Sequence, residues 1–121
     1  MKIIAEKWSF NGKGQIREID IPADELTGSV DHDLELAFKY GQNMFQSRPM
    51  PSLSVGDIVN MPVGDTFEQW LVLGMGWHKF EDHLEYLDYI QKVLADERFS
   101  GHNVVWEIER KQDEKHREAT V

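Results

Sequence analysis

The chain contains no cysteine, which excludes disulfides, thiolate metal sites and cysteine nucleophiles. It also lacks any apolar run close to the roughly 18 residues that a membrane-spanning helix needs. Lys2, Glu6 and Lys7 interrupt the amino-terminal stretch, so we expect neither a signal peptide nor a membrane anchor. These absences predict a soluble, cytoplasmic protein that does not bind membranes.

A core of ordinary size is nevertheless available. The 121 residues include four Trp, three Tyr and six Phe, and each aromatic side chain buries on the order of 150–250 Å² when it enters a core. A chain of this length folds without metal or disulfide staples. We therefore expect residues 1–110 to form a single α+β domain, followed by a flexible charged tail over residues 111–121.

Acidic residues outnumber basic ones 22 to 13, which gives a formal net charge of −9. Between Glu18 and Phe38 the charged residues are all acidic. A negative field repels phosphate backbones, so direct nucleic-acid binding is not expected, whereas a protein partner with a basic surface is compatible with it. The simplest role of the acidic excess is solubility.

The apolar pattern predicts two β-hairpins. Residues 2–10 and 15–21 flank Asn11-Gly12-Lys13-Gly14, and residues 55–61 and 67–73 flank Val63-Gly64-Asp65. Gly and Asn tolerate the positive φ of tight turns, so both breaks are typical of hairpin loops. Gly74-Met75-Gly76-Trp77 is interpreted as a flexible joint.

Two helices and a last strand complete the prediction. One helix starts at a Ser29 or Asp31 cap and ends near Gly41, and the other covers residues 81–97 with Leu84, Leu87 and Leu94 on its buried side. Residues 103–108 are rich in β-branched and aromatic residues and predict a strand. The order ββαββαβ favours an α+β fold in which a mostly antiparallel sheet of about five strands carries its two helices on one face.

No group of residues predicts catalysis. Asp57 and Asp65 each follow a glycine, where an Asp commonly closes a turn by accepting backbone N–H groups. On a helix, His78 and His83 would point about 140° apart, which is poor geometry for a shared ion. Gly74-Met75-Gly76 lacks the third glycine of a dinucleotide-binding loop. We expect no catalytic residues, no bound metal and no cofactor.

Two groups of residues are candidates for binding. Glu81, Asp82, Glu85 and Asp88 place negative charge along one helix face and are the candidate partner-binding residues. A protein that imitates the DNA backbone presents such a stripe to a basic groove, although any solvated amphipathic helix has the same pattern. Trp70, Trp77 and Trp106 are candidates to line a pocket for a small molecule.

Several segments of the middle of the chain resemble one known family. They are Asp33-Leu34-Glu35-Leu36-Ala37-Phe38, Gly41-Gln42-Asn43, Pro51-Ser52-Leu53-Ser54-Val55-Gly56-Asp57-Ile58-Val59 and the stretch from Gly74 to Trp77. Residues 33–77 are in this way similar to YodL-like domains, small proteins frequent in phages, plasmids and other mobile elements. Trp77 stands where that family usually has Phe.

The resemblance implies a context more than a mechanism, because the family is associated with no enzymatic activity. It leads us to expect a non-enzymatic accessory or regulatory protein of a bacteriophage or mobile element that binds a host protein. Two alternatives stay open from the residues: an acidic nucleic-acid mimic that inhibits a host defence nuclease, and a protein that binds or sequesters a small molecule.

Overall fold

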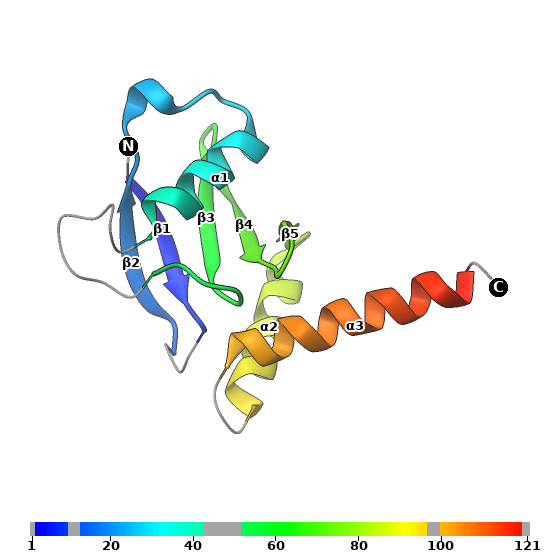
Figure 1. Ribbon diagram of the computed structural model, residues 1–121. Coiled ribbons are helices and arrows are strands. Elements are labelled where there is room, and N and C mark those ends of the chain that lie inside the picture. Colours follow the sequence, from blue (N-terminus) through cyan, green and yellow to red (C-terminus); the bar gives the residue numbers. More distant parts are fainter. Residues whose placement is uncertain (1, 10–12, 43–51, 97–99, 120–121) are drawn as a thin grey trace.

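Five strands form one antiparallel sheet in the computed structural model, which describes residues 2–9, 13–42, 52–96 and 100–119 (Figure 1). Their order in the sheet is β2-β1-β3-β4-β5. The strands are β1 (Lys2–Lys7), β2 (Gln15–Asp20), β3 (Ile58–Val63), β4 (Thr66–Val72) and β5 (Trp77–Lys79). The helices are the short 3-10 helix η1 (Ala23–Glu25), α1 (Val30–Tyr40), α2 (His83–Ala95) and α3 (Gly101–Ala119). The α+β class and the antiparallel sheet are confirmed, with the chain order ββαβββαα.

Both predicted hairpins are present. β1 pairs with β2 from Lys2↔Asp20 to Lys7↔Gln15, and β3 pairs with β4 from Ile58↔Leu71 to Val63↔Thr66. Gly14 and Gly64 have positive φ values of 78° and 59° in the two connections, as tight turns require. The fifth strand, however, is β5, which begins inside the stretch that the sequence predicts as a flexible joint.

The predicted last strand over residues 103–108 is wrong, because this segment belongs to α3. Val104, Val105 and Ile108 fall on one side of a helix, where they pack with Tyr89 and Val93 of α2. This packing overrides the β propensity of the valines. The structure therefore has one more α-helix than predicted, and α3 continues to Ala119 through most of the predicted tail, extending away from the sheet (Figure 1).

The helices lie on opposite faces of the sheet, which corrects the prediction that they share one. Ile3, Ala5 and Val59 pack with Leu34 and Ala37 of α1. The neighbouring strand residues point the other way: Ile58 and Leu71 pack with residues of α2 and α3. Alternation along the strands thus produces two apolar clusters, one on each face.

The buried side of α2 differs from the predicted leucine stripe. Tyr89 and Val93 are its buried residues, whereas Leu84, Leu87 and Leu94 are exposed, Leu84 by 75%. The hydroxyl of Tyr89 donates to the carbonyl oxygen of Gly56 at 2.5 Å. Burial of the aromatic ring together with this bond places the tyrosine face, not the leucine face, against the sheet.

Asp57 is a completely buried acid, with an exposed fraction of 0%. Its Oδ1 accepts hydrogen bonds from the backbone N–H groups of Trp8 and Ser9, both at 2.8 Å. Its Oδ2 accepts from the backbone N–H of Ser54 and from the ammonium of Lys7, both at 2.9 Å. The predicted turn role of Asp57 is confirmed, and the carboxylate also joins the end of β1 to the start of β3.

Gly56 and Gly101 allow the start of α3 to pack closely against the segment that contains Asp57. The backbone N–H of Gly101 donates to the carbonyl oxygen of Trp8 at 2.8 Å. A Cβ on Gly101 would lie 2.5 Å from the Tyr89 hydroxyl and 2.8 Å from the carbonyl oxygen of Gly56. Only glycine fits at this contact, because real Cβ atoms do not approach other atoms so closely.

Replacing Asp57 by Asn is expected to lower the free energy of unfolding by about 3–5 kcal/mol, because the buried Lys7 ammonium loses its counter-charge. Asp65→Asn is the matched control, since Asp65 also follows a glycine but is exposed, and it should change stability by less than about 0.5 kcal/mol. Urea unfolding of both variants measures the difference. Equal effects of the two substitutions would contradict the assigned role.

Gly101→Ala is expected to cost about 1–3 kcal/mol of stability through overpacking. Arg110→Ala, at an exposed position of the same helix, is the control and should leave the melting temperature nearly unchanged. If Gly101→Ala melts like the wild type, the close approach of α3 to Gly56 is not present in solution.

Candidate binding groove

The four predicted acidic residues gather at the start of α2, where they make local contacts. Asp82 caps the helix, accepting from the backbone N–H of Glu85 at 2.8 Å. Glu85 contacts His78 with one oxygen and accepts from the backbone N–H of Glu81 at 3.1 Å with the other. Asp88 forms an ion pair with Lys92 at 3.0 Å. Capping and ion pairing of this kind stabilise helices, so three of these acids have an intramolecular role.

The three predicted pocket tryptophans do not form one pocket. Trp70 and Trp77 pack against the apolar cluster on the α1 face, whereas Trp106 lies on α3 and is 67% exposed. Trp77 borders a hollow of about 160 Å³ beside Phe38 and Glu35. Its indole N–H donates to a carboxylate oxygen of Glu35 at 3.2 Å.

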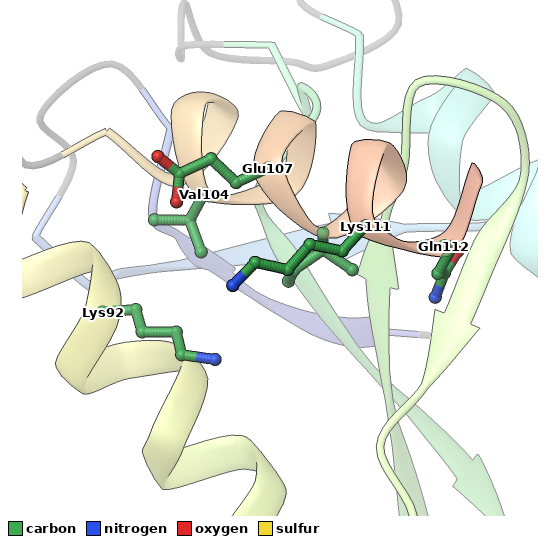
Figure 2. A pocket seen from close by; sticks show the side chains of 6 residues that line it. Lys92, Val104, Glu107, Lys111 and Gln112 are labelled. Atoms are coloured by element: carbon green, nitrogen blue, oxygen red, sulfur yellow. The ribbon is translucent and has the colours of Figure 1, made fainter. Parts of the chain in front are cut away.

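A second hollow, of about 340 Å³, lies between α2 and α3. Figure 2 shows that Lys92 and Lys111 extend into the gap between the two helices. Val104 and Ile108 supply apolar surface, and Glu107 stands on the rim. Because Lys92 is already paired with Asp88 and Glu107 adds a negative charge, the hollow has little charge preference for a ligand.

The largest of these hollows is a groove of about 400 Å³ on the sheet face that carries α2. α2 and α3 cover the end of this face at Ile58 and Leu71 and leave the other end open. We call this hollow the open-face groove. Its lining residues come from β1, β3 and β4: Lys2, Ile4, Glu6, Asn60, Pro62, Thr66, Phe67 and Gln69.

Apolar side chains form the walls of the open-face groove. Phe67 pairs with Pro62 across β4 and β3, and Phe67 is 62% exposed. Ile4 stands on the neighbouring strand β1 and is exposed as well. Exposed apolar side chains that line one concavity mark a binding surface more often than single scattered ones do.

A row of hydrogen-bonded polar side chains forms the floor. The side-chain amide of Gln69 donates to Asn60 Oδ1 at 3.1 Å, and the amide of Asn60 donates to Glu6 Oε2 at 3.1 Å. Glu6 Oε1 accepts from the indole N–H of Trp8 at 3.0 Å and from the Tyr86 hydroxyl at 2.5 Å. The row therefore ends on a carboxylate that is only 7% exposed.

The surroundings of Glu6 are polar but uncharged. Its three donors are an indole, a phenol and an amide, and within the described ranges no Lys, Arg or His forms an ion pair with it. Burial, and then the bond to Glu6 and its negative charge, raise the pKa of Tyr86 far above its usual value. Tyr86 thus stays a hydrogen-bond donor at neutral pH.

Sequence reasoning missed the open-face groove, although a signal was present. Along β1, Ile4 and Glu6 alternate with Ile3 and Ala5, which pack on the α1 face, so Ile4 and Glu6 point to the other face of the sheet. The polar Asn60 and Gln69 interrupt apolar strands that lie inside the sheet. Polar residues at matched positions of interior strands indicate a face that no helix covers.

Other kinds of site receive less support from the described part of the chain. Nowhere in it do three His, Asp or Glu side chains gather closely enough to hold a metal ion. Its helices are too short or too polar to cross a bilayer.

Tyr86→Phe is expected to lower the free energy of unfolding by about 1–3 kcal/mol at neutral pH, because the buried carboxylate loses a donor. Since the pKa of Tyr86 is raised on folding from 10.0, its contribution is complete below pH 10 and decreases as the pH rises above it. Urea unfolding at pH values above 10 should therefore show that the free energy of unfolding decreases more steeply with pH for the wild type than for Tyr86→Phe. Parallel pH dependences would contradict the placement of this phenol.

Comparison of the chain with protein-family models, with curated proteins and with solved structures finds no match in any of the three. The similarity of residues 33–77 to YodL-like domains therefore stays a prediction. The part of that resemblance centred on Ser54 to Asp57 coincides with the Asp57 hydrogen bonds, so a structural reason for those residues exists in this fold.

Proposed function

We propose that the protein is a non-enzymatic accessory or regulatory protein that binds a segment of another protein in the open-face groove. The supporting observation is the combination of exposed Phe67, Ile4 and Pro62 walls with a fixed polar floor. Apolar walls supply binding energy, and hydrogen-bonding groups held in place supply orientation. This combination is what a recognition site for a protein segment requires.

The shape of the groove favours a protein segment over a small molecule. Small-molecule sites typically bury about 70–90% of the ligand surface. Phe67, a wall of this groove, is itself 62% exposed, so an occupant is covered from one side only. A segment that stays attached to a folded partner loses less from such one-sided coverage, because the rest of the partner adds contact area.

The resemblance to YodL-like domains supports the part of the proposal that concerns the biological role and the partner. It suggests a phage or mobile-element protein whose partner is a host protein of the cytoplasm. The acidic nucleic-acid mimic remains the competing hypothesis, and it places the contact on Glu81, Asp82, Glu85 and Asp88 at the start of α2 instead of on the groove. The two hypotheses therefore predict different sensitive residues.

Selection of a random peptide library against the folded protein tests the proposal. Selected peptides should bind the wild type at least about tenfold more tightly than Phe67→Glu, because the substitution puts a charge on an apolar wall. A double variant, Glu81→Gln with Asp88→Asn, is the matched control on α2 and should bind normally. Peptides that ignore Phe67→Glu, or an absence of selected peptides, would contradict binding in the groove.

A further inference from the structure

We infer that the occupant of the open-face groove inserts an arginine side chain whose guanidinium binds the Glu6 carboxylate. The inference rests on the proposed function and adds the chemistry of the partner. Two charged side chains line the groove, Lys2 and Glu6. Lys2 is already paired with Glu18, whereas the described contacts of the Glu6 carboxylate are neutral donors. A partner with a cationic side chain supplies the missing charge.

The hydrogen-bond capacity of Glu6 leaves room for this contact. A carboxylate accepts about four hydrogen bonds. Oε1 accepts two, from Trp8 and Tyr86, and Oε2 accepts one, from Asn60. The remaining acceptor position is thus on Oε2, which is the oxygen on the side of the groove floor.

Because the Glu6 carboxylate is buried, a cation at this acceptor position binds more strongly than it would at an exposed carboxylate. A carboxylate that is 7% exposed has lost most of its water, and neutral donors compensate a buried negative charge only in part. Charge-assisted hydrogen bonds are roughly twice as strong as neutral ones. Glu6 therefore favours a positively charged group over a neutral donor of the same shape.

Neither Lys2 nor Lys79 fills this role. Lys2 lines the groove but forms an ion pair with Glu18 at 3.3 Å. Lys79 stands opposite Trp70, which packs on the α1 face, so Lys79 lies on the other side of the sheet. Within the described residues the Glu6 charge is thus uncompensated in a protein whose formal net charge is −9, and an electrostatically complementary segment is a basic one.

Arginine fits the groove better than lysine. A guanidinium is less strongly hydrated than an ammonium, so it costs less to move onto a buried carboxylate. Its long apolar stem can pack along Ile4 while the head reaches Glu6. The amide of Asn60, already bonded to Glu6, lies next to this path.

The register of the sheet sets the spacing of the partner residues. Glu6 pairs with Ile58, and Phe67 pairs with Pro62, four residues further along β3. This separation is roughly 13 Å at about 3.3 Å per residue. An extended partner segment can place an apolar residue over Phe67 and Pro62 and an arginine two residues further along its own chain. The two residues span about half of the 13 Å, and the long arginine side chain spans the rest.

A blocked tripeptide of leucine, serine and arginine is the direct probe, and the same peptide with neutral citrulline in place of arginine is its isosteric control. NMR titration follows the side-chain amides of Asn60 and Gln69 and the indole N–H of Trp8. The arginine peptide should shift these signals saturably and bind at least about tenfold more tightly than the citrulline peptide. Added salt should weaken the arginine peptide selectively.

Glu6→Gln should remove the preference for arginine over citrulline, while Glu107→Gln, at an exposed position of α3 outside the groove, should keep it. Phe67→Ala adds a test in a variant whose fold is not at risk, because Phe67 is exposed. It should weaken both peptides and keep their ratio. Loss of the preference in Phe67→Ala would overturn the assignment of arginine to Glu6.

The outcomes separate this inference from the proposed function. If both peptides bind equally, or if library-selected peptides bind through Phe67 but contain no basic residue, the arginine inference is overturned and the groove remains a binding site. If neither peptide moves the groove signals and no selected peptide depends on Phe67, both proposals are overturned.

Discussion

The carboxylate of Asp57 is the interaction on which the rest of the molecule depends. It is fully buried, and its four hydrogen bonds join the end of β1, the turn at Ser54 and the ammonium of Lys7. A buried ion pair adds little net stability compared with apolar packing, but it strongly disfavours any arrangement that separates its partners. Asp57 therefore acts mainly by specifying how β1 meets β3, and hence the pairing of the two hairpins in one sheet.

The position of the groove follows from the same contact. Tyr89 of α2 bonds to the carbonyl of Gly56, and the N–H of Gly101 at the start of α3 bonds to the carbonyl of Trp8. Both helices are thus attached at the Asp57 end of their sheet face, where Ile58 and Leu71 become buried. The opposite end of that face stays uncovered. A single structural joint accordingly determines both which apolar residues form the core and which remain available to a partner.

Local signals in the sequence predicted the fold class, both hairpins, α1 and α2, because turn residues and apolar periodicity act over short distances. These local signals could not determine how a helix is rotated about its own axis, or which distant segments pack against each other. The Leu84, Leu87 and Leu94 stripe is as apolar as the tyrosine side of α2, and only the hydroxyl partner of Tyr89 decides between them. The strand predicted over residues 103–108 failed likewise, since helical packing of Val104 and Val105 depends on α2. The groove depends on which end of the sheet is covered, and the polar residues Asn60 and Gln69 indicate that end only once the pairing of β3 with β4 is known.

Hydrogen exchange tests most directly whether the hydrogen bonds of Asp57 open only when the whole protein unfolds. Native-state exchange can measure the opening free energy of the backbone N–H groups of Trp8, Ser9 and Ser54, all of which donate to Asp57. The role assigned to Asp57 predicts that these values equal the global free energy of unfolding and decrease with denaturant at the same slope. Exchange through local openings of much lower free energy, insensitive to denaturant, would contradict it.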